Sequence, residues 1–203
     1  RGITTTVASA GGDAREAIAY VIEAMLQSPR FIYRVETQRG EGREIMIDEY
    51  ELASRISYII WGGPPDKELI EAAEAGELFD DELLQQQLDR MLRDERAVNQ
   101  SIEFISQWLN LDRLNNLNPS AAAFPDWAPE LADDMRQETL AFFRDVVWDQ
   151  NRPLADLFNA QLTYATPQLA RFYGLETVGD GLQRYDLQAV PARGGMLTHA
   201  GVL

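Results

Sequence analysis

Apolar residues recur three and four positions apart along most of the chain, which is the spacing of helices with one buried face. Each of these runs follows a residue suited to beginning a helix, and several end at glycine or before proline. The pattern predicts a mainly α fold, an irregular multi-helix bundle. The residues at which we expect helices to begin are Asp13, Asp48, Asp66, Asp80, Asp94, Pro129 and Thr166.

The helical spacing is lost near the C-terminus. Residues 179–193 carry no three-and-four pattern, and Leu182, Tyr185 and Leu187 alternate in the way that is typical of a strand. We therefore expect a small β or irregular element near the C-terminus, next to the helices.

The same pattern suggests how the chain is divided. We expect an irregular lead-in over residues 1–12 and an N-terminal helical region over residues 13–110. A connection containing Asn and Pro over residues 111–127 is the predicted internal boundary, and a C-terminal helical region follows over residues 128–203. The apolar ending predicts that this last region leads into a further module.

Composition narrows the set of partners. The net charge is −15, from 33 acidic and 18 basic residues. Such a surface repels nucleic acid and suits a protein partner, a basic one in particular. No apolar run approaches the roughly 20 residues of a membrane helix, so we expect no transmembrane segment. The absence of cysteine excludes disulfides and zinc–thiolate sites within these residues.

His199 is the only histidine and the sharpest candidate for chemistry. It could bind the iron of a haem in a following module, act as an acid–base group, or be structural, and the structural interpretation is favoured. We expect no catalytic set and no metal site in this segment. The amides of Arg193–Gly195 could hold an anion, although such a glycine pair more often serves a turn.

Two carboxylates lie among apolar helical positions. Glu138 and Glu103 would have raised pKa values if buried, and the favoured interpretation pairs each with an arginine. Aromatic residues at helical spacing are more often core than ligand platform. Trp108 and Phe142 are therefore predicted to lie in the core.

Several short segments, taken in order, carry a resemblance to a known family. They are residues 25–36 (MLQSPRFIYRVE), 52–62 (LASRISYIIWG), 65–69 (PDKEL), 104–109 (FISQWL), 138–143 (ETLAFF), 169–174 (LARFYG) and 193–198 (RGGMLT). The chain resembles the domains of unknown function, abundant in planctomycetes, that occur together with c-type cytochrome modules.

The resemblance implies an exported, periplasmic or otherwise extracytoplasmic, mainly helical protein. It also implies that a module with a Cys-x-x-Cys-His haem-attachment motif follows. That motif is absent here, so the resemblance places c-type haem downstream and no cofactor in this segment.

Three functions remain open at this point. The first is an extracytoplasmic helical scaffold or docking domain of a c-type-haem-associated protein, within a redox or surface complex. The second is an accessory domain of an enzyme acting on extracellular polysaccharide, which a pocket with two carboxylates roughly 5–9 Å apart would favour. The third is a subunit-interface protein without a redox role, which a large exposed apolar face would favour.

Overall fold

The structure is a computed structural model, and it describes residues 13–33, 36, 47–120, 122, 124, 125, 127–190 and 192–203. The predicted lead-in over residues 1–12 lies outside the described residues.

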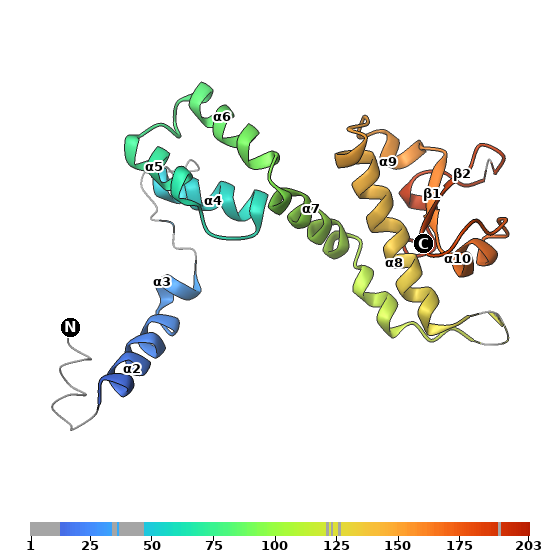
Figure 1. Ribbon diagram of the computed structural model, residues 1–203, viewed down its shortest axis with the longest axis horizontal. Coiled ribbons are helices and arrows are strands. Elements are labelled where there is room, and N and C mark those ends of the chain that lie inside the picture. Colours follow the sequence, from blue (N-terminus) through green and yellow to red (C-terminus); the bar gives the residue numbers. More distant parts are fainter. Residues whose placement is uncertain are drawn as a thin grey trace, which may run out of the picture. The chain divides into compact units, whose positions relative to one another are not determined.

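Helices dominate the described part of the chain, and two short strands form a small antiparallel sheet near the C-terminus (Figure 1). The prediction of a mainly α fold with a small β element in that region is confirmed. The α-helices are α2 (Ala14–Leu26), α3 (Pro29–Ile32), α4 (Glu49–Trp61), α5 (Lys67–Ala75), α6 (Asp81–Leu92), α7 (Glu95–Trp108), α8 (Pro129–Arg144), α9 (Asp156–Asn159) and α10 (Pro167–Phe172). The strands are β1 (Leu162–Ala165) and β2 (Gln183–Asp186); η1 (Leu111–Asn116) and η3 (Met196–Thr198) are 3₁₀ helices, and η2 (Asp145–Asp149) is a π-helical turn.

The predicted helix starts carry the expected caps. Asp13 forms a capping box with Glu16, and the Asp66 side chain accepts a hydrogen bond from the Leu69 amide at 3.0 Å. Gly76 ends α5 in the left-handed conformation, with φ at 73°. These caps satisfy backbone groups that each helix end would otherwise leave without partners.

The chain separates into two compact units. One contains the described residues up to Ile59 together with Gly63–Leu88, and the other contains Ile60–Gly62 and Asp89–Leu203. The connection predicted over residues 111–127 lies inside the second unit. Its first part is the η1 helix, whose two leucines are buried, so this division differs from the one drawn from the sequence.

In the first unit, α2 forms as predicted but its apolar stripe is exposed. Ile18, Ile22, Met25 and Leu26 are between 50 % and 62 % exposed. Among the described elements, α2 makes its main contacts with the short α3 helix. The three-and-four spacing therefore predicted the helix correctly, but its apolar face is not buried against the described residues.

The second unit is organised around α8. A single stripe along this helix repeats at intervals of four and three residues, and every side chain in it is buried. The stripe consists of Leu131, Met135, Glu138, Phe142 and Asp145. Two carboxylates therefore occupy positions at which a helix normally places apolar residues.

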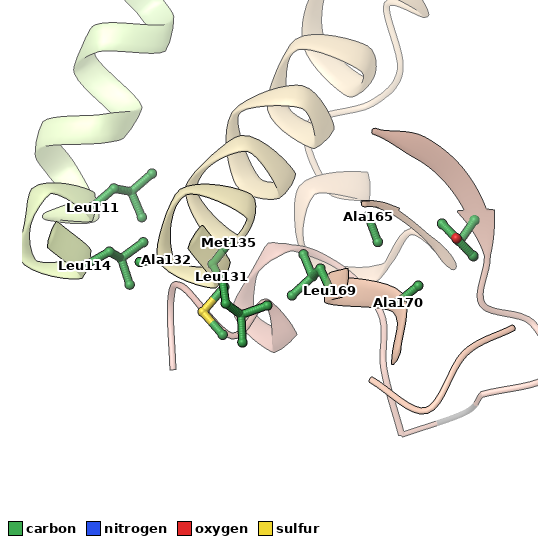
Figure 2. Close-up of a cluster of buried hydrophobic side chains, with 9 residues drawn as sticks. Leu111, Leu114, Leu131, Ala132, Met135, Ala165, Leu169 and Ala170 are labelled. Carbon is green, nitrogen blue, oxygen red and sulfur yellow. The ribbon is translucent and has the colours of Figure 1, made fainter. Parts of the chain in front are cut away.

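The core of this unit lies on both sides of α8 (Figure 2). Figure 2 shows Leu111 and Leu114 of η1 on one side of the helix and Leu169 of α10 on the other. A second buried cluster, around Phe142, includes Leu162 of β1 and Met196 of η3. Burying aliphatic and aromatic side chains of this size stabilises the unit by about 1.5–3 kcal/mol each.

The small sheet gives α8 a strand, β1, to pack against. Strands β1 and β2 are antiparallel, with Thr163 opposite Tyr185 and Tyr164 opposite Arg184. Neighbouring residues of a strand point to opposite faces. Thr163 and Tyr185 are accordingly buried, whereas Tyr164 is half-buried and Arg184 exposed. The strand predicted within residues 179–193 is confirmed, whereas β1 was not predicted.

Candidate functional site

The most unusual feature of the second unit is a carboxylate in its core. Glu138 is fully buried on α8, and both its oxygens accept short hydrogen bonds from hydroxyl groups. Thr163 of β1 donates to Oε1 and Tyr173 donates to Oε2, each at 2.5 Å. Distances of this size are typical of a hydroxyl donating to a carboxylate. Glu138 thereby joins α8 to β1 and to the end of α10.

His199 lies beside this carboxylate. Its ring is 2 % exposed, and its Nε2 is 4.0 Å from Oε1 of Glu138. The Thr139 hydroxyl is 3.2 Å from Nδ1 and donates its own proton to the carbonyl of Met135 at 3.3 Å. The Nε2 atom is buried and has no hydrogen-bond partner among the described residues. The edge-to-face contact with Phe142, at 4.9 Å between centroids, covers the ring.

Tyr173 extends the network to the last segment of the chain. Its hydroxyl accepts a hydrogen bond from the Ala200 amide at 2.9 Å while it donates to Glu138. The Arg193 guanidinium lies over the Tyr173 ring, 3.6 Å from its centroid, and donates to the Thr198 carbonyl. This set of contacts fastens residues 193–200 to α8 and α10.

Burial moves the pKa values of both titratable groups in opposite directions. It raises the pKa of Glu138 to about 7, against the lowering effect of the Thr163 and Tyr173 hydroxyls and of the Arg193 charge. It lowers the pKa of His199 to about 3, and the positive charge of Arg193 acts in the same direction. Near neutral pH, His199 is therefore neutral and Glu138 is close to half protonated. The Tyr173 pKa is raised by burial and by the adjacent Glu138 carboxylate.

Chemically, this cluster can hold a proton. Acid–base catalysis also requires that a substrate can reach the group. Glu138 and His199 are enclosed by protein, so a substrate cannot reach them in this conformation. The cluster is therefore better suited to fixing the positions of four chain segments than to acting on a bound molecule.

The sequence predicted an arginine partner for each of two carboxylates, and the prediction is wrong for both. Glu138 accepts hydrogen bonds from two hydroxyls, and Arg193, whose charge lowers its pKa, forms no described ion pair with it. Glu103 is exposed and accepts a hydrogen bond from Gln107 at 2.7 Å, one turn along the same helix. Hydroxyl donors can take the place of a cation beside a buried carboxylate, because a hydrogen bond to the charged form stabilises it.

The two aromatic residues predicted to be core behave differently. Phe142 is completely buried, as predicted. The prediction for Trp108 is wrong, because its side chain is 62 % exposed and stacks on Phe104, 6.1 Å away between centroids. Successive helical residues are rotated by about 100°. Phe104 and Trp108 consequently lie on a face next to the one that buries Ile105.

The glycine pair before His199 serves a turn in this structure. The Gly194 amide donates to the Thr198 hydroxyl at 3.0 Å, and the Gly195 amide donates to the Ala160 carbonyl at 2.9 Å. Gly195 has φ at 65°, and a Cβ there would lie 2.2 Å from the carbonyl carbon of Phe158. Glycine is required at this position, and both amides already have partners within the protein.

A second polar site lies two turns further along α8. Asp145 is 7 % exposed, and its Oδ2 has no hydrogen-bond partner among the described residues. Burial, the charge of Asp145 and a side-chain hydrogen bond with Asp145 raise the pKa of Tyr164 to about 12. With Gln150, Arg152 and Arg184, these residues line an open pocket of about 650 Å³.

One residue of this second site could have been predicted from the sequence. Asp145 is seven residues after Glu138, on the buried stripe, so its carboxylate was placed for burial like that of Glu138. Tyr164 and Arg184 could not be found in this way, because only the pairing of β1 with β2 brings them together.

The remaining predictions concern a metal site, a membrane-spanning helix and a haem ligand. No group of three His, Asp or Glu side chains suited to holding a metal ion occurs in that part of the chain. Within the same residues, no helix has both the length and the apolar character needed to cross a membrane. Ligation of a haem iron by His199 stays a prediction, and it requires the ring to leave its buried position.

These features define a class: a mainly helical protein in which one long helix packs against a two-stranded antiparallel sheet through a buried Glu–Tyr–Thr–His network. The chain belongs to the PSD4 family, proteins of unknown function (DUF1592), whose family model matches residues 47–175. That range includes Glu138, Thr163 and Tyr173 and ends before His199. The searches of curated proteins and of solved structures found no match.

Proposed function

We propose that this chain is a helical scaffold or docking domain of an extracytoplasmic protein associated with c-type haem. The observation that carries the structural part of the proposal is the Glu138 network. The groups that could have served as acid and base, Glu138 and His199, are enclosed in the core and hold residues 193–200 against α8. A domain whose residues 193–200 are held in this way provides a rigid attachment point for a neighbouring module.

The haem is assigned to a following module, as the resemblance implies, because the residues here do not fit one. An axial ligand needs an open face toward the iron. The Nε2 atom of His199 instead faces Oε1 of Glu138 at 4.0 Å inside the protein, and the chain has no cysteine for covalent attachment. The periplasmic location rests on the same resemblance.

The charge of the chain supports a basic partner. A net charge of −15 on 203 residues attracts positively charged proteins and accelerates their encounter. A redox protein with a basic face around its haem edge fits this description, and docking of that kind is sensitive to salt.

The test is a titration of the ¹⁵N-labelled chain with a basic c-type cytochrome, followed by NMR at low and at raised ionic strength. We expect saturable shifts on a contiguous surface and an affinity that falls by roughly tenfold or more with salt. An acidic c-type cytochrome of similar size is the matched control. Absence of shifts with the basic protein, or equal shifts with both proteins, would contradict the proposal.

A specific observation favours a second candidate, the subunit-interface role. The exposed apolar stripe of α2 is of the kind that a partner covers, because it places four large side chains in water. Light scattering on the purified chain tests this candidate. We expect self-association that weakens in Ile22→Glu and persists in the matched variant Glu23→Gln. A monomer at high concentration would exclude an interface between copies of the chain.

A further inference from the structure

Helix α7 exposes two aromatic side chains to solvent. Phe104 and Trp108 lie one turn apart on this helix and are 59 % and 62 % exposed, while Ile105, which lies between them in the sequence, is buried. Their rings are nearly parallel, at an angle of 13° and with 6.1 Å between the centroids. Each ring restricts the other, so the pair presents a preorganised apolar surface. Together with the adjacent Glu103 we call these residues the aromatic patch.

Exposed aromatic pairs of this kind are typical of protein interfaces. A single exposed apolar residue needs no explanation, whereas adjacent large ones mark contact sites. Tryptophan is enriched among the residues that dominate binding energy, because its ring buries a large area at a small cost in side-chain entropy. The exposed rings contribute little burial to the fold of the second unit, so contact with a partner explains their position better.

The polar groups around the rings determine which charge a partner needs. Glu103 is exposed, and its Oε1 accepts a hydrogen bond from Gln107 at 2.7 Å, which holds the carboxylate on the helix stripe next to the rings. Trp108 is the last residue of α7, and the last turn of this helix carries no basic residue. The partial negative charge at that helix end is therefore not offset by a side chain of the helix. Both features attract a cation.

The two arginines nearest to the end of α7 have other partners. Arg113 donates to the carbonyls of Gly201 and Val202, each at 3.2 Å. Arg136 forms an ion pair with Asp112. These contacts leave the charge of Glu103 for a partner to neutralise.

Charge also selects between two kinds of protein partner. A second copy of the chain, paired by a two-fold axis at the patch, would bring Glu103 of each copy together on chains of net charge −15. A basic protein has the complementary charge, and its lysine or arginine side chains can stack on a tryptophan ring while they approach a carboxylate. A stacking contact of the same kind occurs inside this chain, where the Arg96 guanidinium lies 3.5 Å from the centroid of the Trp61 ring.

We propose that the aromatic patch is the surface on which a basic protein docks, with a lysine or arginine of the partner lying over Trp108 and close to Glu103. The inference rests on the docking role proposed above. It adds the surface of this chain and the side chains by which the partner recognises it.

The experiment is a titration of the ¹⁵N-labelled chain and its variants with the basic c-type cytochrome, followed by NMR at low and at raised ionic strength. We expect the largest shifts at residues 103–108. Trp108→Ala should weaken binding by roughly tenfold or more at both ionic strengths, because the contact that it removes is mainly apolar. Glu103→Gln should weaken binding several-fold at low ionic strength, and this difference should shrink as salt screens the charge.

Two variants in the first unit are the matched controls. Phe79→Ala removes an aromatic side chain that is 60 % exposed, and Glu74→Gln neutralises an exposed carboxylate of α5. Both should bind the cytochrome as the unchanged chain does. Circular dichroism checks that each variant is folded, and if Trp108→Ala does not fold, the loss of binding expected in Phe104→Ala decides the question.

The outcomes separate this inference from the docking role. If the unchanged chain binds the cytochrome but Trp108→Ala binds it equally well, or if the shifts lie outside residues 103–108, the patch is not the docking surface and the docking role stands. If the unchanged chain does not bind the cytochrome, both are wrong. Shifts at the patch that depend on the concentration of the chain alone would identify a second copy as its occupant and overturn the inference.

Discussion

Replacing Glu138 by glutamine should change how the stability of the chain depends on pH. The pKa of Glu138 is about 7 in the folded chain against an ordinary value of 4.5. Its contribution to stability is therefore complete below pH 4.5, falls as pH rises from 4.5 to 7, and is lost above 7. The difference between the two pKa values corresponds to about 3 kcal/mol of unfolding free energy.

His199 opposes this trend in the unchanged chain. Its pKa is about 3 when folded and 6.5 ordinarily, so its contribution is present above pH 6.5 and is lost as pH falls toward 3. Between pH 4.5 and 6.5 the two effects act in opposite directions. In Glu138→Gln only the histidine effect remains, so the variant should gain stability relative to the unchanged chain by about 3 kcal/mol between pH 4.5 and 7.

Urea denaturation followed by circular dichroism from pH 4.5 to 8 measures this difference. Glu103→Gln is the matched control, because Glu103 is an exposed helical carboxylate with a single hydrogen bond to Gln107. Its stability difference from the unchanged chain should stay constant over the same range. A constant difference for Glu138→Gln as well would refute the reasoning, since it would mean that Glu138 titrates normally in the folded protein.

Three further outcomes follow from the structure. Phe142→Ala should lower the unfolding free energy by about 3–5 kcal/mol, whereas Trp108→Ala should change it by less than about 1 kcal/mol, because only Phe142 is buried. Equal denaturant midpoints for the two variants would contradict this difference in burial. Gly195→Ala should destabilise the fold by more than about 1 kcal/mol, because the new Cβ collides with the backbone of Phe158; thermal unfolding checks this, and an unchanged midpoint would show that the turn can move. The chain with added haem should show no bound Soret band, and a stoichiometric complex that disappears in His199→Ala would make that histidine a ligand.

The helices were predictable because their signals are local. Asp13, Asp66 and Thr166 cap helices at the places where apolar spacing begins, and each cap acts within three residues. Strand β1 was not predictable in the same way. Its four residues, Leu162–Ala165, are too few to show an alternating pattern. They form a strand because β2 pairs with them from about twenty positions away.

The candidate site was predictable only in part. His199 and Glu138 were identified as residues worth attention, because one is unique and the other interrupts an apolar stripe. Their proximity was not predicted, because 61 positions separate them in the sequence and no periodicity connects them. The hydroxyl partners Thr163 and Tyr173 have no distinctive sequence signal, because threonine and tyrosine are ordinary core residues when their hydroxyls have partners.

The position of Glu138 in the chain has a consequence for how the second unit forms. A carboxyl group that enters a core before its partners arrive must be dehydrated without compensation. The groups that satisfy Glu138 lie 25 and 35 residues later in the chain, and the histidine beside it comes later still. Helix α8 therefore cannot pack stably against β1 until residues 163, 173 and 199 are in place. During synthesis this unit should remain open until its last residues have left the ribosome, and it should then close in one cooperative step.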